Sequence, residues 1–148
     1  MSISPQKNRE IIFQLLYSDD FGGAEEEIIE MLMSQLSVTK RIVREANLFK
    51  NQILERKDAI DELIKEYSES YAFERIPRVE RNLLRLGIYE LLFSKAVPPK
   101  VVIAEAIRLS RKFSTPESAA FINAILDEVY KEISTQQNDV PALSSQTL

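Results

Sequence analysis

The chain has 148 residues, a net charge of −4, and neither cysteine nor histidine. These absences exclude disulfides, thiolate chemistry, zinc sites built from cysteine or histidine, and Ser-His-Asp or Cys-His catalytic groups. Only three glycines are present and no glycine-rich phosphate-binding motif occurs, so the composition favours helices over tight hairpin turns.

The length corresponds to about one domain. No apolar run is long enough to cross a membrane, and the first residues lack the apolar segment of a signal peptide. We therefore expect a cytoplasmic protein with no membrane association.

Apolar residues recur at helical spacing along most of the chain. Ser4 followed by Pro5 is a typical helix start, and the first helix is expected to end within 19–23. Further helices are expected at about 24–36 and 39–55, and another uses the apolar positions between 60 and 67. A connection over 68–77 follows.

The fifth predicted helix starts near Pro77 and is apolar around much of its circumference, which is typical of a buried central helix. Gly87 in its middle is unfavourable for a helix and indicates a close crossing with another helix. A sixth helix follows Pro98-Pro99, and a seventh follows Thr115-Pro116. The expected fold is therefore all-α, with about seven helices.

These helices are expected to form a single domain over residues 1–134. The remaining segment, 135–148, is polar and has no apolar stripe. We expect it to be a disordered tail.

Charge is distributed unevenly along the chain. Residues 72–113 carry nine basic and four acidic side chains, whereas the rest of the chain carries ten basic and nineteen acidic ones. Arg78, Arg81 and Arg85 are expected on one face of the fifth helix. The charge pattern fits either a solvated face with intramolecular ion pairs or a surface that attracts phosphate.

The first helix carries a stripe formed by Lys7, Glu10, Gln14 and Tyr17, with Arg9 beside it. On an exposed face, a cation, an amide and an aromatic ring can contact a phosphate, a base edge and a base plane. The alternative is structural, with Tyr17 half-buried at the end of the helix.

The corner between the sixth and seventh helices carries Phe113, Glu117, Ser118 and Phe121. One interpretation is an anion site at the start of the seventh helix, with the two rings as stacking surfaces. The other is that the polar residues cap the helix and Phe113 belongs to the core.

Four separated stretches, in the same order, resemble the NusB family of transcription antitermination factors. They are Arg9–Tyr17, Val79–Leu91, Val97–Ser110 and Phe121–Asp127. The resemblance covers about residues 5–133 and is strongest over 74–128. It implies an all-helical fold of two packed three-helix subdomains, with no catalysis, no cofactor and no metal.

The resemblance also implies the partners. NusB proteins bind the boxA element of ribosomal RNA transcripts together with NusE, a ribosomal protein of the small subunit, within RNA polymerase antitermination complexes. Carried over by position, the implied RNA-binding residues are Lys7, Arg9, Gln14, Tyr17, Glu117, Ser118 and Phe121. The implied NusE-facing residues are Glu74 and Glu80. The dense arginine cluster common at the start of the family is reduced here to two cations.

Other functions remain open from the sequence. The same fold can serve as a homodimeric or heteromeric protein-interaction module with weak RNA binding, or as an accessory domain of a ribosomal RNA methyltransferase. The chain contains no Rossmann-type cofactor-binding domain, which a methyltransferase would need. Glu80, Glu90 and Glu105 have no spacing that indicates acid–base catalysis, so we predict no enzymatic activity.

Overall fold

The computed structural model describes residues 2–69, 71–94 and 96–139. The helices in that part of the chain are α1 (Pro5–Asp20), α2 (Glu25–Leu36), α3 (Lys40–Glu55), α4 (Lys57–Tyr67), α5 (Arg78–Phe93), α6 (Pro99–Phe113) and α7 (Pro116–Asp139). A short 3-10 turn, η1 (Phe73–Arg75), precedes α5, and the described residues contain no strand. The all-α prediction, with about seven helices, is confirmed.

Local sequence explains where several helices begin. The Ser4 hydroxyl accepts a hydrogen bond from the Lys7 amide at 3.1 Å, and Pro5 occupies the first turn, where its missing N–H needs no partner. Thr39 caps α3 in the same way, and the Thr115 hydroxyl accepts from the Ser118 amide at the start of α7. These caps satisfy backbone donors that the helices leave unpaired.

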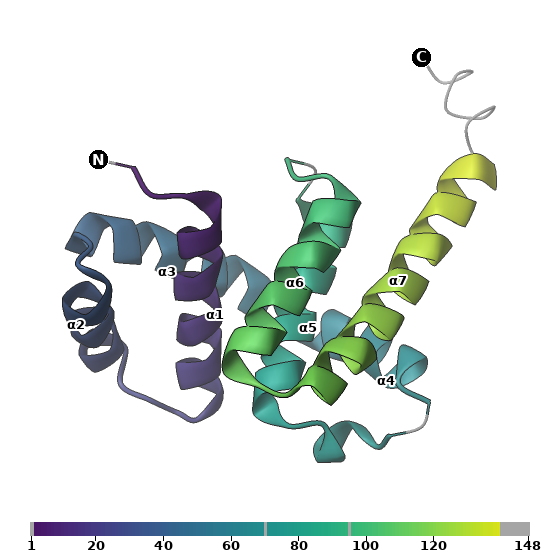
Figure 1. The fold of residues 1–148 in the computed structure, drawn as a ribbon, viewed down its shortest axis with the longest axis horizontal. Coiled ribbons are helices and arrows are strands. Elements are labelled where there is room, and N and C mark those ends of the chain that lie inside the picture. The colour runs from purple at the N-terminus through teal and green to yellow at the C-terminus, as the bar shows by residue number, and fades with distance from the viewer. Residues whose placement is uncertain (1, 70, 95, 140–148) are drawn as a thin grey trace.

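The helices form two groups joined through α1 and α4 (Figure 1). α1, α2 and α3 pack together, and α5, α6 and α7 form the second group. α1 also packs on α5, while α4 contacts both α5 and α7. Eleven of the sixteen residues of α5 are buried, so the expectation of a central buried helix is confirmed.

Gly87 lies where α5 crosses α7. A Cβ atom at this position would lie 3.0 Å from Cδ1 of Leu126 on α7. The glycine therefore permits the close approach of the two helices that its position in the sequence suggested.

Buried polar groups connect the helices across this core. Arg85 of α5 is buried and donates to both carboxylate oxygens of Asp61 on α4, at 2.8 and 2.9 Å. Arg85 also donates to Asn82, which in turn donates to Asp20 at the end of α1. A buried charge needs such partners because its desolvation is costly. We call Asp61, Arg85, Asn82 and Asp20 the buried network.

α7 is longer than predicted. It continues to Asp139, so residues 135–139 of the expected tail are helical. No glycine or proline interrupts the chain before Pro141, and a polar stretch can extend an existing helix without an apolar stripe. Residues 140–148 of the expected tail lie outside the described residues, and the division at residue 134 stays a prediction. No helix in the described ranges combines the length and apolarity needed to cross a membrane.

Candidate nucleic-acid interface

The later part of the α1 stripe and the α6–α7 corner lie at the same end of the molecule (Figure 1), whereas Lys7 and Arg9 lie near the start of α1, where Arg9 pairs with Glu90 toward the other end of α5. The last turns of α1, the first turn of α5 and the α6–α7 corner meet there. Lys112 near the end of α6 pairs with Glu10 of α1 at 2.7 Å, and Ser114 of the corner donates to Glu80 of α5. We call this the site end; the opposite end of α5, at Phe93 and the α5–α6 connection, is the loop end.

A row of aromatic rings runs across the site end. Ring centroids are 5.1 Å apart for Phe113 and Phe13, 6.0 Å for Phe13 and Tyr17, and 4.8 Å for Tyr17 and Phe21. Phe13 is buried, Tyr17 is half-buried, and Phe21 is 55% exposed. The Arg78 guanidinium lies 4.3 Å from the Phe21 ring centroid. The row therefore presents accessible aromatic surface beside a cation.

A hollow of about 310 Å³ opens between the α6–α7 corner and the segment that leads into α5. Its lining includes Tyr71, Arg75, Glu80, Thr115, Glu117, Ser118 and Phe121. The Tyr71 and Phe121 rings meet edge to face, with centroids 5.4 Å apart. Sequence reasoning missed Tyr71 and counted Arg75 only as part of the basic segment, because both lie in an irregular connection without helical periodicity.

The structure leaves five of the seven predicted RNA-binding residues accessible. Lys7, Gln14, Tyr17 and Phe121 are partly buried, and Glu117 is exposed. Tyr17 is held between two other rings and is half-buried at the helix end, as the structural alternative expects, while its contact with RNA stays a prediction.

Arg9 differs from the expectation of an exposed cation. It is only 7% exposed, and its Nε atom donates to the Glu90 carboxylate at 3.0 Å. Its Nη1 atom lies 3.5 Å from Glu105. Glu90 is itself buried, so the two charges compensate each other within the core instead of facing solvent.

Ser118 and Glu80 also differ from their expected positions. Ser118 is buried, and its hydroxyl forms a hydrogen bond with that of Ser110 on α6 at 3.1 Å. Glu80 is buried and accepts a hydrogen bond from Ser114, whereas Glu74 is exposed on η1. Ser118 and Glu80 therefore hold the corner in place, and Glu74 is the accessible member of the predicted partner-facing pair.

Ion pairs neutralise much of the basic segment. Besides Arg85, Arg108 pairs with Glu105 at 2.8 Å, and its guanidinium also donates to the Gln6 carbonyl oxygen. The hydrogen bond from Arg108 to Glu105 raises the pKa of the arginine, so its charge is fixed. Arg75 and Arg78 are exposed at the site end. Ion pairing therefore accounts for part of the basic segment, and a phosphate-attracting surface at Arg75 and Arg78 stays a prediction.

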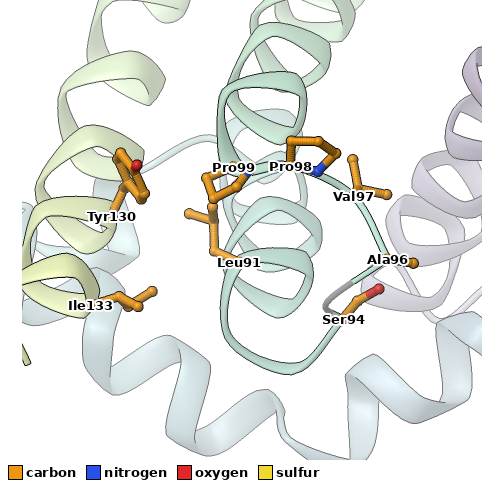
Figure 2. Close-up of a pocket in the computed structure, with 8 residues that line it drawn as sticks. All are labelled: Leu91, Ser94, Ala96, Val97, Pro98, Pro99, Tyr130 and Ile133. Carbon is orange, nitrogen blue, oxygen red and sulfur yellow. The ribbon is translucent and has the colours of Figure 1, made fainter. Parts of the chain in front are cut away.

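A second hollow of about 340 Å³ lies at the loop end (Figure 2). It is lined by Leu91, Ser94, Ala96, Val97, Pro98, Pro99, Tyr130 and Ile133. Tyr130 and Ile133 of α7 face Leu91 and Pro99 across it. The described residues of this lining carry no charged side chain, and no cluster of carboxylates suited to a metal ion occurs in the part of the chain that the structure describes.

Comparisons with known proteins agree with this architecture. The model of the NusB family matches residues 6–131. The chain is 38% identical over 136 residues to the transcription antitermination protein NusB of Chlamydia pneumoniae, an alignment that covers 91% of this chain and 85% of that protein. It is 34% identical over 139 residues to NusB of Dehalococcoides mccartyi strain CBDB1, covering 93% and 97%.

Solved structures give the same result. NusB of T. maritima superposes with a TM-score of 0.76 at 34% identity, covering 89% of this chain and 94% of that one. A chain in the crystal structure of antitermination factors NusB and NusE in complex with dsRNA has a TM-score of 0.72 at 26% identity, covering 86% and 96%. The chain therefore belongs to the NusB family, a family of transcription antitermination factors and not of enzymes.

Proposed function

We propose that this chain binds the boxA element of ribosomal RNA transcripts through the site end, together with NusE, as part of an RNA polymerase antitermination complex. The observation that carries the proposal is the aromatic row, whose accessible rings lie beside exposed cations. Such a complex acts on nascent transcripts, which places the protein in the cytoplasm.

The residue types at the site end suit single-stranded RNA. Proteins read unpaired bases mainly by stacking them on aromatic rings or guanidinium planes, and by hydrogen bonds to the base edges. Tyr17 offers a ring and Gln14 on the turn before offers an amide, while Lys7, on the same stripe near the start of α1, offers a cation for a phosphate. Phe121 and Tyr71 offer two further rings at the hollow.

Arg9, Ser118 and Glu80 have a positioning role in this proposal. Arg9 fixes α1 against α5 through Glu90, and Glu80 fixes the corner through Ser114. Their burial gives the accessible residues a rigid support. Glu74, which is exposed on η1, is the side chain in this region that we propose to face NusE.

The relatives support a protein partner and an RNA ligand. One solved structure holds NusB with NusE and dsRNA, and the chain that superposes on this protein covers most of its length. The charge also supports a partner, because Arg9, Arg108 and Lys112 are engaged in ion pairs and are therefore less available to hold phosphates. We therefore expect NusE to strengthen RNA binding.

The test is a titration of a boxA oligonucleotide with the purified protein, with and without NusE, over a range of salt concentrations. We expect binding that weakens with salt and strengthens with NusE. Lys7→Ala should lower the log–log salt slope by about 0.7, the value for one phosphate contact on a single strand. Lys40→Ala, at the exposed start of α3, is the matched control and should leave the slope unchanged.

The alternative is a protein-interaction module that forms homodimers or heteromers and binds RNA weakly. The extensive ion pairing of the basic segment favours this reading over a strongly basic RNA binder. Absence of boxA binding both with and without NusE, together with concentration-dependent sedimentation of the protein alone, would establish the alternative.

A further inference from the structure

Phe21 and Arg78 form an exposed pair that the sequence analysis did not single out. Phe21 caps the end of α1 with its ring 55% exposed, and Arg78 is the first residue of α5. The guanidinium lies over the ring at 4.3 Å from its centroid, and its Nε atom is 3.7 Å from Asp20. The pair places an accessible aromatic face and a cation side by side on the surface.

Contacts with the buried network fix the position of the pair. Asp20, next to Phe21 in the chain, accepts a hydrogen bond from Asn82 at 3.1 Å, and Asn82 is held by Arg85 within the buried network. After Phe21 the chain turns sharply through Gly22, whose φ of 75° is a conformation that glycine adopts readily. The ring therefore stands at a defined place and not on a loose loop.

The pair continues the aromatic row beyond Tyr17. The Tyr17 and Phe21 ring centroids are 4.8 Å apart, and the ring planes are inclined at 66°. The two rings thus form a corner, in which each offers a separate surface to a flat ligand. The positive charge of Arg78 at this point complements an RNA backbone, which carries one negative charge for each nucleotide.

We propose that Phe21 and Arg78 bind one further nucleotide of the RNA strand, adjacent to the one that contacts Tyr17. The base stacks against Phe21, and the Arg78 guanidinium contacts the phosphate of the same nucleotide. This inference rests on the proposed function, since it extends the RNA-binding surface to a residue pair at the end of α1 and the start of α5.

The chain supplies a matched control. Phe93 at the loop end is 40% exposed and carries Arg56 over its ring, at 4.2 Å from the centroid. The Phe93–Arg56 pair has the same chemistry and nearly the same geometry, but it lies at the other end of α5. Replacement of either phenylalanine by leucine keeps an apolar side chain and removes the aromatic face.

The experiment compares Phe21→Leu with Phe93→Leu in boxA binding, using oligonucleotides that carry the fluorescent base 2-aminopurine at successive positions. Loss of one stacked base should weaken binding roughly 5- to 150-fold in Phe21→Leu. The wild-type protein should quench 2-aminopurine at a position where Phe21→Leu does not. Phe93→Leu should behave as wild type in both measurements.

Arg78→Gln gives an independent readout that does not depend on the ring. We expect it to lower the log–log salt slope by about 0.7 while the melting temperature stays near that of Arg56→Gln. If Phe21→Leu unfolds at a lower temperature, Phe21→Tyr keeps the ring and should restore both affinity and quenching.

The outcomes separate this inference from the proposed function. Wild-type binding that depends on Tyr17 but is unchanged in Phe21→Leu and Arg78→Gln would overturn the inference and leave the proposed function standing. Absence of RNA binding by the wild-type protein, with and without NusE, would overturn both.

Discussion

The two ends of α5 share their main features and still differ in what they offer to a ligand. Each carries an exposed phenylalanine under a guanidinium, at 4.3 Å for Phe21 and 4.2 Å for Phe93. Each also has a hollow, of about 310 Å³ at the site end and about 340 Å³ at the loop end. Neither a stacked cation nor a hollow therefore distinguishes a binding surface by itself.

The difference lies in the neighbours. At the site end, rings, an amide and cations from α1, α5 and the α6–α7 corner adjoin one another, because several helix ends meet there. At the loop end, the described residues that line the hollow are aliphatic side chains, two prolines, a serine and Tyr130, and none of these is charged. A continuous set of stacking, hydrogen-bonding and cationic groups is what an RNA strand requires.

The largest expected effect comes from breaking the buried network that supports the site end. Asp61→Ala removes the carboxylate that faces the buried Arg85 guanidinium, and an uncompensated buried charge costs about 3–5 kcal/mol. Urea unfolding measures this loss. The control, Lys131→Ala, breaks ion pairs in which the lysine side chain is 64% exposed, and should cost less than about 1 kcal/mol. Equal losses of unfolding free energy in the two variants would contradict this prediction.

A smaller effect separates the two ends by RNA affinity. Tyr17→Leu removes a half-buried ring at the site end, and Tyr130→Leu removes a half-buried ring at the loop-end hollow. Loss of one stacking contact is worth about 1–3 kcal/mol, so we expect boxA binding to weaken only in Tyr17→Leu. Fluorescence anisotropy of a labelled oligonucleotide measures both variants. Comparable weakening by Tyr130→Leu would move RNA binding to the loop end.

The smallest effect concerns pH and the packing of α4 on α7. Burial, followed by the charges of Glu132, Glu66 and Glu128, raises the pKa of Tyr67 above its usual value of 10.0. The folded protein therefore holds this proton more tightly than the unfolded chain, and stability falls as pH rises above about 10. Below that pH both states are protonated and the effect vanishes.

Tyr67→Phe removes this ionisation. We expect the variant to lose less unfolding free energy than the wild type between about pH 9 and about pH 11. The comparison at about pH 8 is the control, since the phenol is neutral there in both states. Parallel pH profiles for the two proteins would contradict the prediction.

Much of the site could be predicted from the sequence where the signals were local. Tyr17 and Gln14 lie on a stripe of one helix, and Phe121 follows a cap-and-proline start, so their accessibility follows from helical spacing. Phe21 and Arg78 lie at helix ends, where the periodicity of apolar residues does not predict which way a side chain points. Their proximity depends on how α1 meets α5.

Arg9 shows most clearly what could not be predicted from the sequence. In the sequence it is one of two cations at a thinly basic start, and it resembles a phosphate contact. In the structure its partner is Glu90, which is 81 positions away, and both charges are buried. Exposure of a charged residue depends on the partner that the fold brings to it, and that partner has no local signature.

The sequence by itself determined the helices of this protein, since caps, prolines and apolar periodicity act within a few residues of each position. It also determined the need for a close crossing at Gly87. Only the tertiary structure decided which cations are free to meet RNA, because desolvation and pairing select between burial and exposure for each charge. The same packing brought Phe21 and Arg78 together and made one end of α5 different from the other.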